Sequence, residues 1–194
     1  MKKLLLQILL LAGTMNTSIG QKNSYGVSAG IGRGFIIQEP LMGGAGHDLN
    51  NGILLGFQYT RKLNDKFHLM TGINWCYYRL SVTPNFYPGV ERSTKYYNFN
   101  LIYLPAFIKM NLSKHFFLDG GLIGDIDLTK DKPISNQTGI GAGLGVGAEV
   151  MVTHQFTIQL DPYLNFHGLN MIHVEDYPER VFDPGIKLTF VMRK

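Results

Sequence analysis

Apolar and polar residues alternate along residues 139–153 with a period of two. Every even position from Ile140 to Val152 is apolar, whereas the odd positions are mostly glycine, with Glu149 and Thr153 among them. Because successive side chains of a β-strand point to opposite faces, this stretch predicts a strand with one apolar face and one small or polar face. It is longer than the roughly five or six residues of a soluble strand and suits a tilted strand that crosses a bilayer.

Similar alternation recurs along the chain and predicts eight strands and no helix. The stretches are residues 25–36, 52–63, 67–80, 97–110, 116–129 and 139–153, a strand from Phe156 and a strand from about Arg180. The fourth stretch is apolar on both faces and contains Pro105, which cannot donate a ladder hydrogen bond and indicates a β-bulge. Short turns follow the second, fourth and sixth strands, and longer loops follow the other connected strands. This layout predicts an all-β fold, an eight-stranded antiparallel up-and-down transmembrane β-barrel.

Paired aromatic residues indicate that the apolar faces point outward into lipid. They lie ten residues apart on three strands and form the expected aromatic girdles: Tyr25 with Phe35, Phe67 with Tyr77, and Phe156 with Phe166. A rise of about 3.3 Å per residue and a tilt of about 40° project this spacing to about 25 Å, the height of the apolar band of a membrane barrel.

The opposite faces are expected to line the lumen with a structural polar network. Its predicted members are Lys62, Lys109, Asp119, Asp125, Asp127, Glu149, Asp161 and Lys187. A proton or ion path along these residues is the alternative. Eight strands enclose a space that side chains fill, so no diffusion pore is expected. The lumen-facing glycines of residues 139–147 are expected to make room for long side chains, with a crevice as the alternative.

Residues 1–20 have the composition of a signal peptide. Lys2 and Lys3 precede an apolar centre, and small residues near Gly20 suit cleavage after that residue. The apolar centre is too short to span a bilayer as a helix. Residues 21–194 are then expected to form one outer-membrane β-barrel domain, exported by the cleaved signal peptide and integral to the cell outer membrane.

Composition argues against several other classes of protein. The formal net charge is +4 for the whole chain and about +2 without Lys2 and Lys3, and no basic cluster with interleaved aromatic residues marks a nucleic-acid surface. The single Cys76 excludes an internal disulfide framework and is expected to be a buried, unreactive thiol. No convincing nucleophile with a base is present, so no enzyme activity and no cofactor is expected. No metal is expected either. A cation site could be formed by His173, Glu175 and Asp176 together with His47 and Asp48, but short spacings of this kind are common by chance, so solvated polar loops are expected instead.

Residues 101–109 read Leu-Ile-Tyr-Leu-Pro-Ala-Phe-Ile-Lys, and a short turn separates them from the glycine-containing residues 116–124. This segment resembles the strand–turn–strand signature of the PorT-like outer-membrane β-barrel domain family, although Tyr103 stands where many members have an acid. The resemblance implies a small barrel of the OmpA/OmpX kind. It also implies an alternative role, that of an accessory outer-membrane component of a protein-secretion apparatus.

The end of the chain carries a second resemblance. Asp183, Gly185, Leu188 and Phe190 are similar to the C-terminal signal by which the barrel-assembly machinery recognises its clients, although four residues follow Phe190. The similarity implies that this machinery is a partner during biogenesis.

The loops are where the sequence places function. Met42, Phe86, Tyr87, Met171 and Tyr177 are assigned to external loops beside charged residues, a mixture able to contact a protein or a glycan. The expected function is a non-enzymatic integral outer-membrane barrel, surrounded by outer-membrane lipid, with a structural or interaction role through these loops and no nucleic-acid partner. An envelope-lipid-modifying enzyme is a further alternative.

Overall fold

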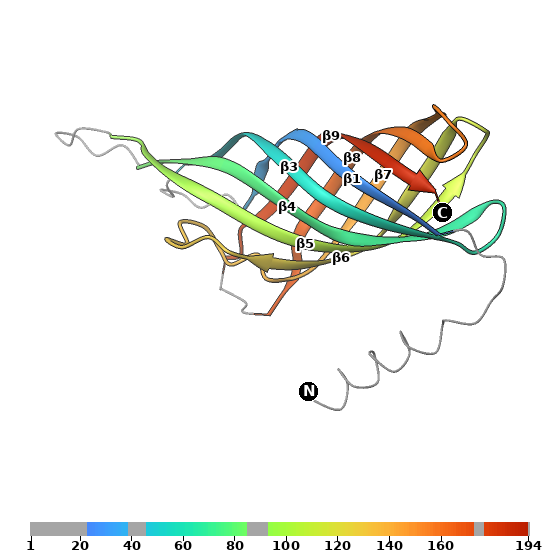
Figure 1. Cartoon of the computed structure of the whole chain (residues 1–194). Coiled ribbons are helices and arrows are strands. Elements are labelled where there is room, and N and C mark those ends of the chain that lie inside the picture. The colour runs from blue at the N-terminus through green and yellow to red at the C-terminus, as the bar shows by residue number, and fades with distance from the viewer. Residues whose placement is uncertain (1–22, 39–45, 85–92, 173–176, 194) are drawn as a thin grey trace.

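The computed structural model describes residues 23–38, 46–84, 93–172 and 177–193, and shows one antiparallel sheet that closes on itself (Figure 1). Its strands are β1 (Asn23–Arg33), β2 (Phe35–Ile37), β3 (Gly46–Lys62), β4 (Phe67–Thr83), β5 (Lys95–Asn111), β6 (Phe116–Asp127), β7 (Gly139–Met151), β8 (Phe156–Met171) and β9 (Arg180–Arg193). β1 and β2 are two parts of one span interrupted at Gly34, and both pair with β9, so eight spans form the ring. The predicted eight-stranded up-and-down barrel is confirmed. The predicted signal peptide lies outside the described residues.

The alternation of side chains along each strand decides what the lumen contains. On β9, Asp183 and Lys187 are buried inside the ring, whereas Phe190 is 58% exposed on the outside. Val27 and Leu122 are 64% and 61% exposed on other strands. A soluble protein does not expose apolar side chains around its whole circumference, so the outer face is built for lipid. The described residues contain no helix long and apolar enough to cross a bilayer.

Three short turns share one sequence pattern, in which an apolar residue, an Asn, Ser or Thr, and two further residues precede a phenylalanine. The turns are residues 63–67, 112–116 and 152–156. The side-chain oxygen of the second residue accepts the phenylalanine N–H at 2.7 Å in Asn64, 3.2 Å in Ser113 and 3.1 Å in Thr153. Each turn therefore starts the next strand with an exposed phenylalanine on its outer face. We call this the turn end of the barrel, and the opposite end the loop end.

The register corrects the expectation of a bulge at Pro105. The pairing of β4 with β5 keeps the same register on both sides of Pro105, and the pairing of β5 with β6 is continuous. The proline is therefore accommodated by leaving a gap in one ladder, without an extra residue. Irregularities lie instead between Leu49 and Gly52 of β3 and opposite Gly141 of β7, where β8 contains Gly168 with a φ of 62°.

At the loop end, three strands extend beyond the rest of the ring (Figure 1). β3 pairs with β4 as far as Gly46 and Thr83, and β4 pairs with β5 as far as Lys95. The pairing of β5 with β6 begins only at Leu101. β3, β4 and β5 therefore form an extension, residues 46–50, 78–83 and 95–100, on one side of the barrel at the loop end.

Candidate functional site

Four of the eight predicted lumen charges form two close ion pairs. Lys109 Nζ lies 2.6 Å from Glu149 Oε2, and Lys187 Nζ lies 2.9 Å from Asp161 Oδ2. Arg193, at the end of β9, adds a contact of 3.3 Å to Glu149 Oε1. The second pair is shielded from solvent, with side chains 10% and 3% exposed for Lys187 and Asp161. Lys187 and Asp161 face each other on the neighbouring strands β9 and β8, whereas Lys109 of β5 reaches Glu149 of β7 past β6.

Asp119 lies next to the second pair. It is buried, and neither of its carboxyl oxygens has a hydrogen-bond partner among the described residues. A Cβ added to Gly145 would lie 2.6 Å from Asp161 Oδ1 and 2.7 Å from Asp119 Oδ1. Glycine at this position is thus what lets both carboxyl groups reach the wall of β7.

Other glycines of β7 act in the same way. A Cβ on Gly143 would meet the ring of Phe107 and the side chain of Ile123, and a Cβ on Gly147 would meet the ring of Phe117. These glycines make room for large side chains as expected, but the side chains come from the nearby strands β5, β6 and β8 and not from across the barrel.

His167 occupies a site that the sequence pattern did not single out. Its Nδ1 lies 2.8 Å from Asp125 Oδ1, and its Nε2 lies 3.9 Å from Asp183 Oδ2. Tyr78 donates its hydroxyl hydrogen to the other oxygen of Asp183. All of these groups are buried. The sequence signal was the period of two, because His167 continues the lumen-facing positions of β8 directly after Asn165.

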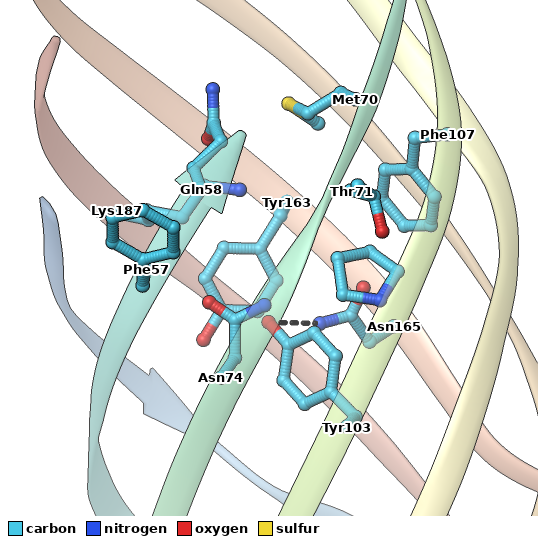
Figure 2. A pocket seen from close by; sticks show the side chains of 11 residues that line it. Phe57, Gln58, Met70, Thr71, Asn74, Tyr103, Phe107, Tyr163, Asn165 and Lys187 are labelled. Carbon is cyan, nitrogen blue, oxygen red and sulfur yellow. Dashed lines mark hydrogen bonds between the residues drawn. The ribbon is translucent and has the colours of Figure 1, made fainter. Parts of the chain in front are cut away.

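The middle of the lumen is filled with aromatic and amide side chains (Figure 2). Asn165 Nδ2 donates to Tyr103 Oη at 3.5 Å, and Tyr163 lies beside them. The space left between these groups has a volume of about 10 Å³. A cavity of that size holds about one water molecule, so the lumen is closed at mid-height.

The loop end of the lumen is covered by residues 128–138. Gln137 is fully buried there, and its Nε2 donates to the carbonyl oxygens of Ser135 at 2.7 Å and Glu179 at 2.8 Å. Its Oε1 accepts the Val181 N–H at 3.2 Å. Glu179 also binds His47 of β3 through its side chain. The cover is therefore tied to β9 and, through Glu179, to β3.

The remaining two predicted lumen charges lie at the ends of the barrel. Lys62 Nζ contacts Asp65 Oδ1 at 2.5 Å in the first short turn, where this hydrogen bond lowers the pKa of Asp65. Lys62 also lines a cavity of about 300 Å³ that lies at the turn end, together with Lys109, Glu149 and others. Asp127 accepts main-chain N–H groups of the 128–138 cover.

The predicted girdle residues all lie on the outer face. Tyr25, Phe67 and Phe156 lie at the turn end, and Phe35, Tyr77 and Phe166 lie toward the loop end. Phe182, which the spacing of ten residues did not include, stacks on Phe166 with ring centroids 4.5 Å apart. Phe116 was also missed, although the repeated turn pattern would have found it. In the predicted assembly signal, Asp183 and Gly185 face the lumen while Leu188 and Phe190 face outward.

Several expected loop residues lie outside the described part of the chain: Met42, Phe86, Tyr87, His173, Glu175 and Asp176. Met171 was assigned to a loop, and this is wrong, because it is the buried last residue of β8. His47 and Asp48 belong to β3. No group of three potential metal ligands occurs among the described residues.

The extension at the loop end carries an open strand edge. Asn100 of β5 bonds through its main chain to Thr129 Oγ1 and to the Leu128 N–H, on the side away from β4. Because main-chain groups alternate along a strand, those of Asn98 and Tyr96 face the same side, where no described strand pairs with them. A groove of about 590 Å³ runs along this edge to Lys130.

Comparison with known proteins defines the class of this fold. OprG from Pseudomonas aeruginosa, an outer membrane protein, is similar with a TM-score of 0.55 and 13% identity over 90% of this chain and 96% of that chain. Neisserial surface protein A is similar with a TM-score of 0.52 and 15% identity over 88% and 98% of the two chains. The outer membrane protein AlkL, whose structure was determined in lipid bilayers, is similar with a TM-score of 0.51 and 11% identity over 92% of this chain and 93% of that chain.

The chain therefore has the fold of the small outer-membrane β-barrels. No family model matches it, and no curated protein matches it. The resemblance of residues 101–109 to the PorT-like family stays a prediction, as does the division into a signal peptide and a mature domain.

Proposed function

We propose that the protein is a non-enzymatic, non-conducting barrel of the outer membrane that serves as an anchored platform for an external partner. The observation that carries this proposal is the contrast between the lumen of the barrel and the extension at its loop end. The lumen is filled at mid-height and covered at the loop end, whereas the extension presents an unpaired strand edge beside a groove of about 590 Å³. A closed lumen leaves nothing for solutes to pass through, and an open edge supports pairing with an extended segment of another protein.

The direction of insertion follows from the connections. Membrane barrels place short turns in the periplasm and long loops outside the cell. The turn end, with the end of β9 at Arg193, then faces the periplasm. The extension and the 128–138 cover then face the exterior, where Tyr96 is 59% exposed and the guanidinium of Arg79 lies 4.5 Å from the centre of its ring.

Two measurements test the proposal together. In planar bilayers the purified barrel is expected to give no conductance steps. In cells, a photoreactive amino acid at Tyr96 is expected to give a protein adduct, whereas the same group at Lys114, in a turn at the other end, is expected to give a different pattern or none. Regular conductance steps, or adducts with lipid alone at position 96, would overturn the platform role.

The finer role of an accessory in a protein-secretion apparatus rests on the resemblance of residues 101–109. It requires a stable partner that copurifies in stoichiometric amounts from detergent extracts. An envelope-lipid enzyme is the remaining alternative, and it requires a change in the mass spectrum of envelope lipids when the gene is deleted. An unchanged spectrum together with a stoichiometric secretion partner would select the first of these roles.

A further inference from the structure

Three glycines on neighbouring strands form a row across the wall of the barrel. Gly32 of β1 pairs directly with Gly185 of β9 and with Gly52 of β3. On the lumen side the rings of Tyr163 and Tyr78, from the next strands outward, lie against the row, because a Cβ on Gly185 or Gly52 would overlap with them. The three glycines therefore have no side chains at this level, and two tyrosine rings cover the row on the lumen side.

The outer side of this row is a groove of about 480 Å³. One wall is a row of three isoleucines in register, Ile31, Ile53 and Ile186, which are 68%, 46% and 49% exposed. The other wall contains Arg33 and Asn51, which are paired across β1 and β3. Asn51 belongs to the irregularity of β3 between Leu49 and Gly52, where the pairing of β3 with β4 shifts register.

The groove lies next to the aromatic belt of the loop end. Phe35 follows Arg33 by two positions on the same span, and its ring centroid lies 6.2 Å from that of Phe182. Aromatic belts mark the level where lipid headgroups meet acyl chains. The isoleucine wall thus faces the acyl region, and Arg33 lies at headgroup level.

Arg33 carries a charge on the lipid-facing side. Its guanidinium lies 5.6 Å from the centre of the Phe35 ring, and none of the ion pairs among the described residues includes it. A cation at this depth is stabilised by an anion from the membrane, and guanidinium groups match the geometry of phosphate. An apolar wall and a phosphate-binding cation side by side are the two halves of a phospholipid site.

We propose that this groove binds one phosphate-bearing membrane lipid, with the phosphate at Arg33 and Asn51 and an acyl chain along the isoleucines. The proposal rests on the membrane location in the proposed function but not on the external partner. It gives the barrel a defined lipid contact at the β9–β1–β3 seam.

Native mass spectrometry of the detergent-purified, delipidated full chain tests the proposal with dioleoylphosphatidylglycerol as the probe. One bound lipid is expected for the wild type. Arg33→Gln is expected to weaken binding about tenfold, as the loss of one charge-assisted hydrogen-bonded contact predicts. The control is Arg79→Gln, which removes another exposed arginine of the loop end that does not line the groove, and it is expected to leave binding unchanged.

Dioleoylglycerol, which lacks phosphate, and inorganic phosphate, which lacks acyl chains, are both expected to bind at least tenfold more weakly than the full lipid. Equal losses in Arg33→Gln and Arg79→Gln, or equal binding of dioleoylglycerol, would overturn the site. Heat-modifiable migration on gels checks that each variant is folded, and Arg33→Lys, with intermediate affinity expected, replaces Arg33→Gln if that variant does not fold. A failed adduct at Tyr96 would remove the platform role and leave this result standing.

Discussion

Lys187→Met is expected to destabilise the barrel strongly. Lys187 and Asp161 face each other across β8 and β9, with Nζ and Oδ2 2.9 Å apart and both side chains nearly inaccessible to solvent. Without the lysine, the charge of Asp161 stays buried beside the carboxyl group of Asp119. Removing one partner of a buried ion pair costs about 3–5 kcal/mol, so the free energy of unfolding is expected to fall by that amount.

A double-mutant cycle isolates the pair. Asp161→Leu alone also leaves a buried charge, that of Lys187, and is expected to cost a similar amount. Replacing both residues by apolar ones removes both charges, and such replacements are commonly neutral or stabilising. With about 3–5 kcal/mol lost in each single variant and little change in the double variant, the coupling energy between the two sites is expected to be about 6–10 kcal/mol.

The assay is a urea titration of the folded barrel in detergent micelles, followed by the fluorescence of Trp75, the single tryptophan of the chain. Lys114→Met, in an exposed turn, serves as the control and is expected to change stability by less than about 0.5 kcal/mol. Losses below about 1 kcal/mol in both single variants would refute the buried pair, because water would then have to reach it. A double variant as unstable as the sum of the singles would refute the coupling.

Three further predictions follow from close contacts. Gly52→Ala is expected to cost about 1–3 kcal/mol in the same titration, because the added methyl overlaps the ring of Tyr78, whereas Gly46→Ala, with its nearest atom at 3.9 Å, is expected to be nearly neutral. Gln137→Ala is expected to speed hydrogen exchange of the main-chain amide it holds on β9 by tenfold or more, since its loss leaves buried groups unpaired; unchanged exchange would contradict the role of the cover. Cys76 is fully buried and is expected to react with a maleimide only after unfolding in urea, so rapid labelling of the folded barrel would show that the lumen is open.

The sequence by itself determined the spans of the barrel and which face of each span meets lipid. This was possible because the side-chain period of a strand is two residues, so the pattern of residues 139–153 can be interpreted without knowing any neighbour. The short turns were equally local, since a side chain such as that of Asn64 satisfies N–H groups only two or three residues ahead. Charged positions such as Lys109 and Asp161 were assigned to the lumen by the same rule.

Only the tertiary structure decided which of these residues meet. Glu149 and Lys109 come from strands that are not adjacent, and the row of Gly185, Gly32 and Gly52 exists only because the first span pairs with the last. His167 continues the lumen-facing positions of β8 at period two, but only the arrangement of the strands brings it to Asp125 and Asp183. Ring closure and register bring together residues far apart in the chain, and one added or missing residue in a strand changes every such partner, so the lumen contacts and the outer groove could not be predicted from alternation alone.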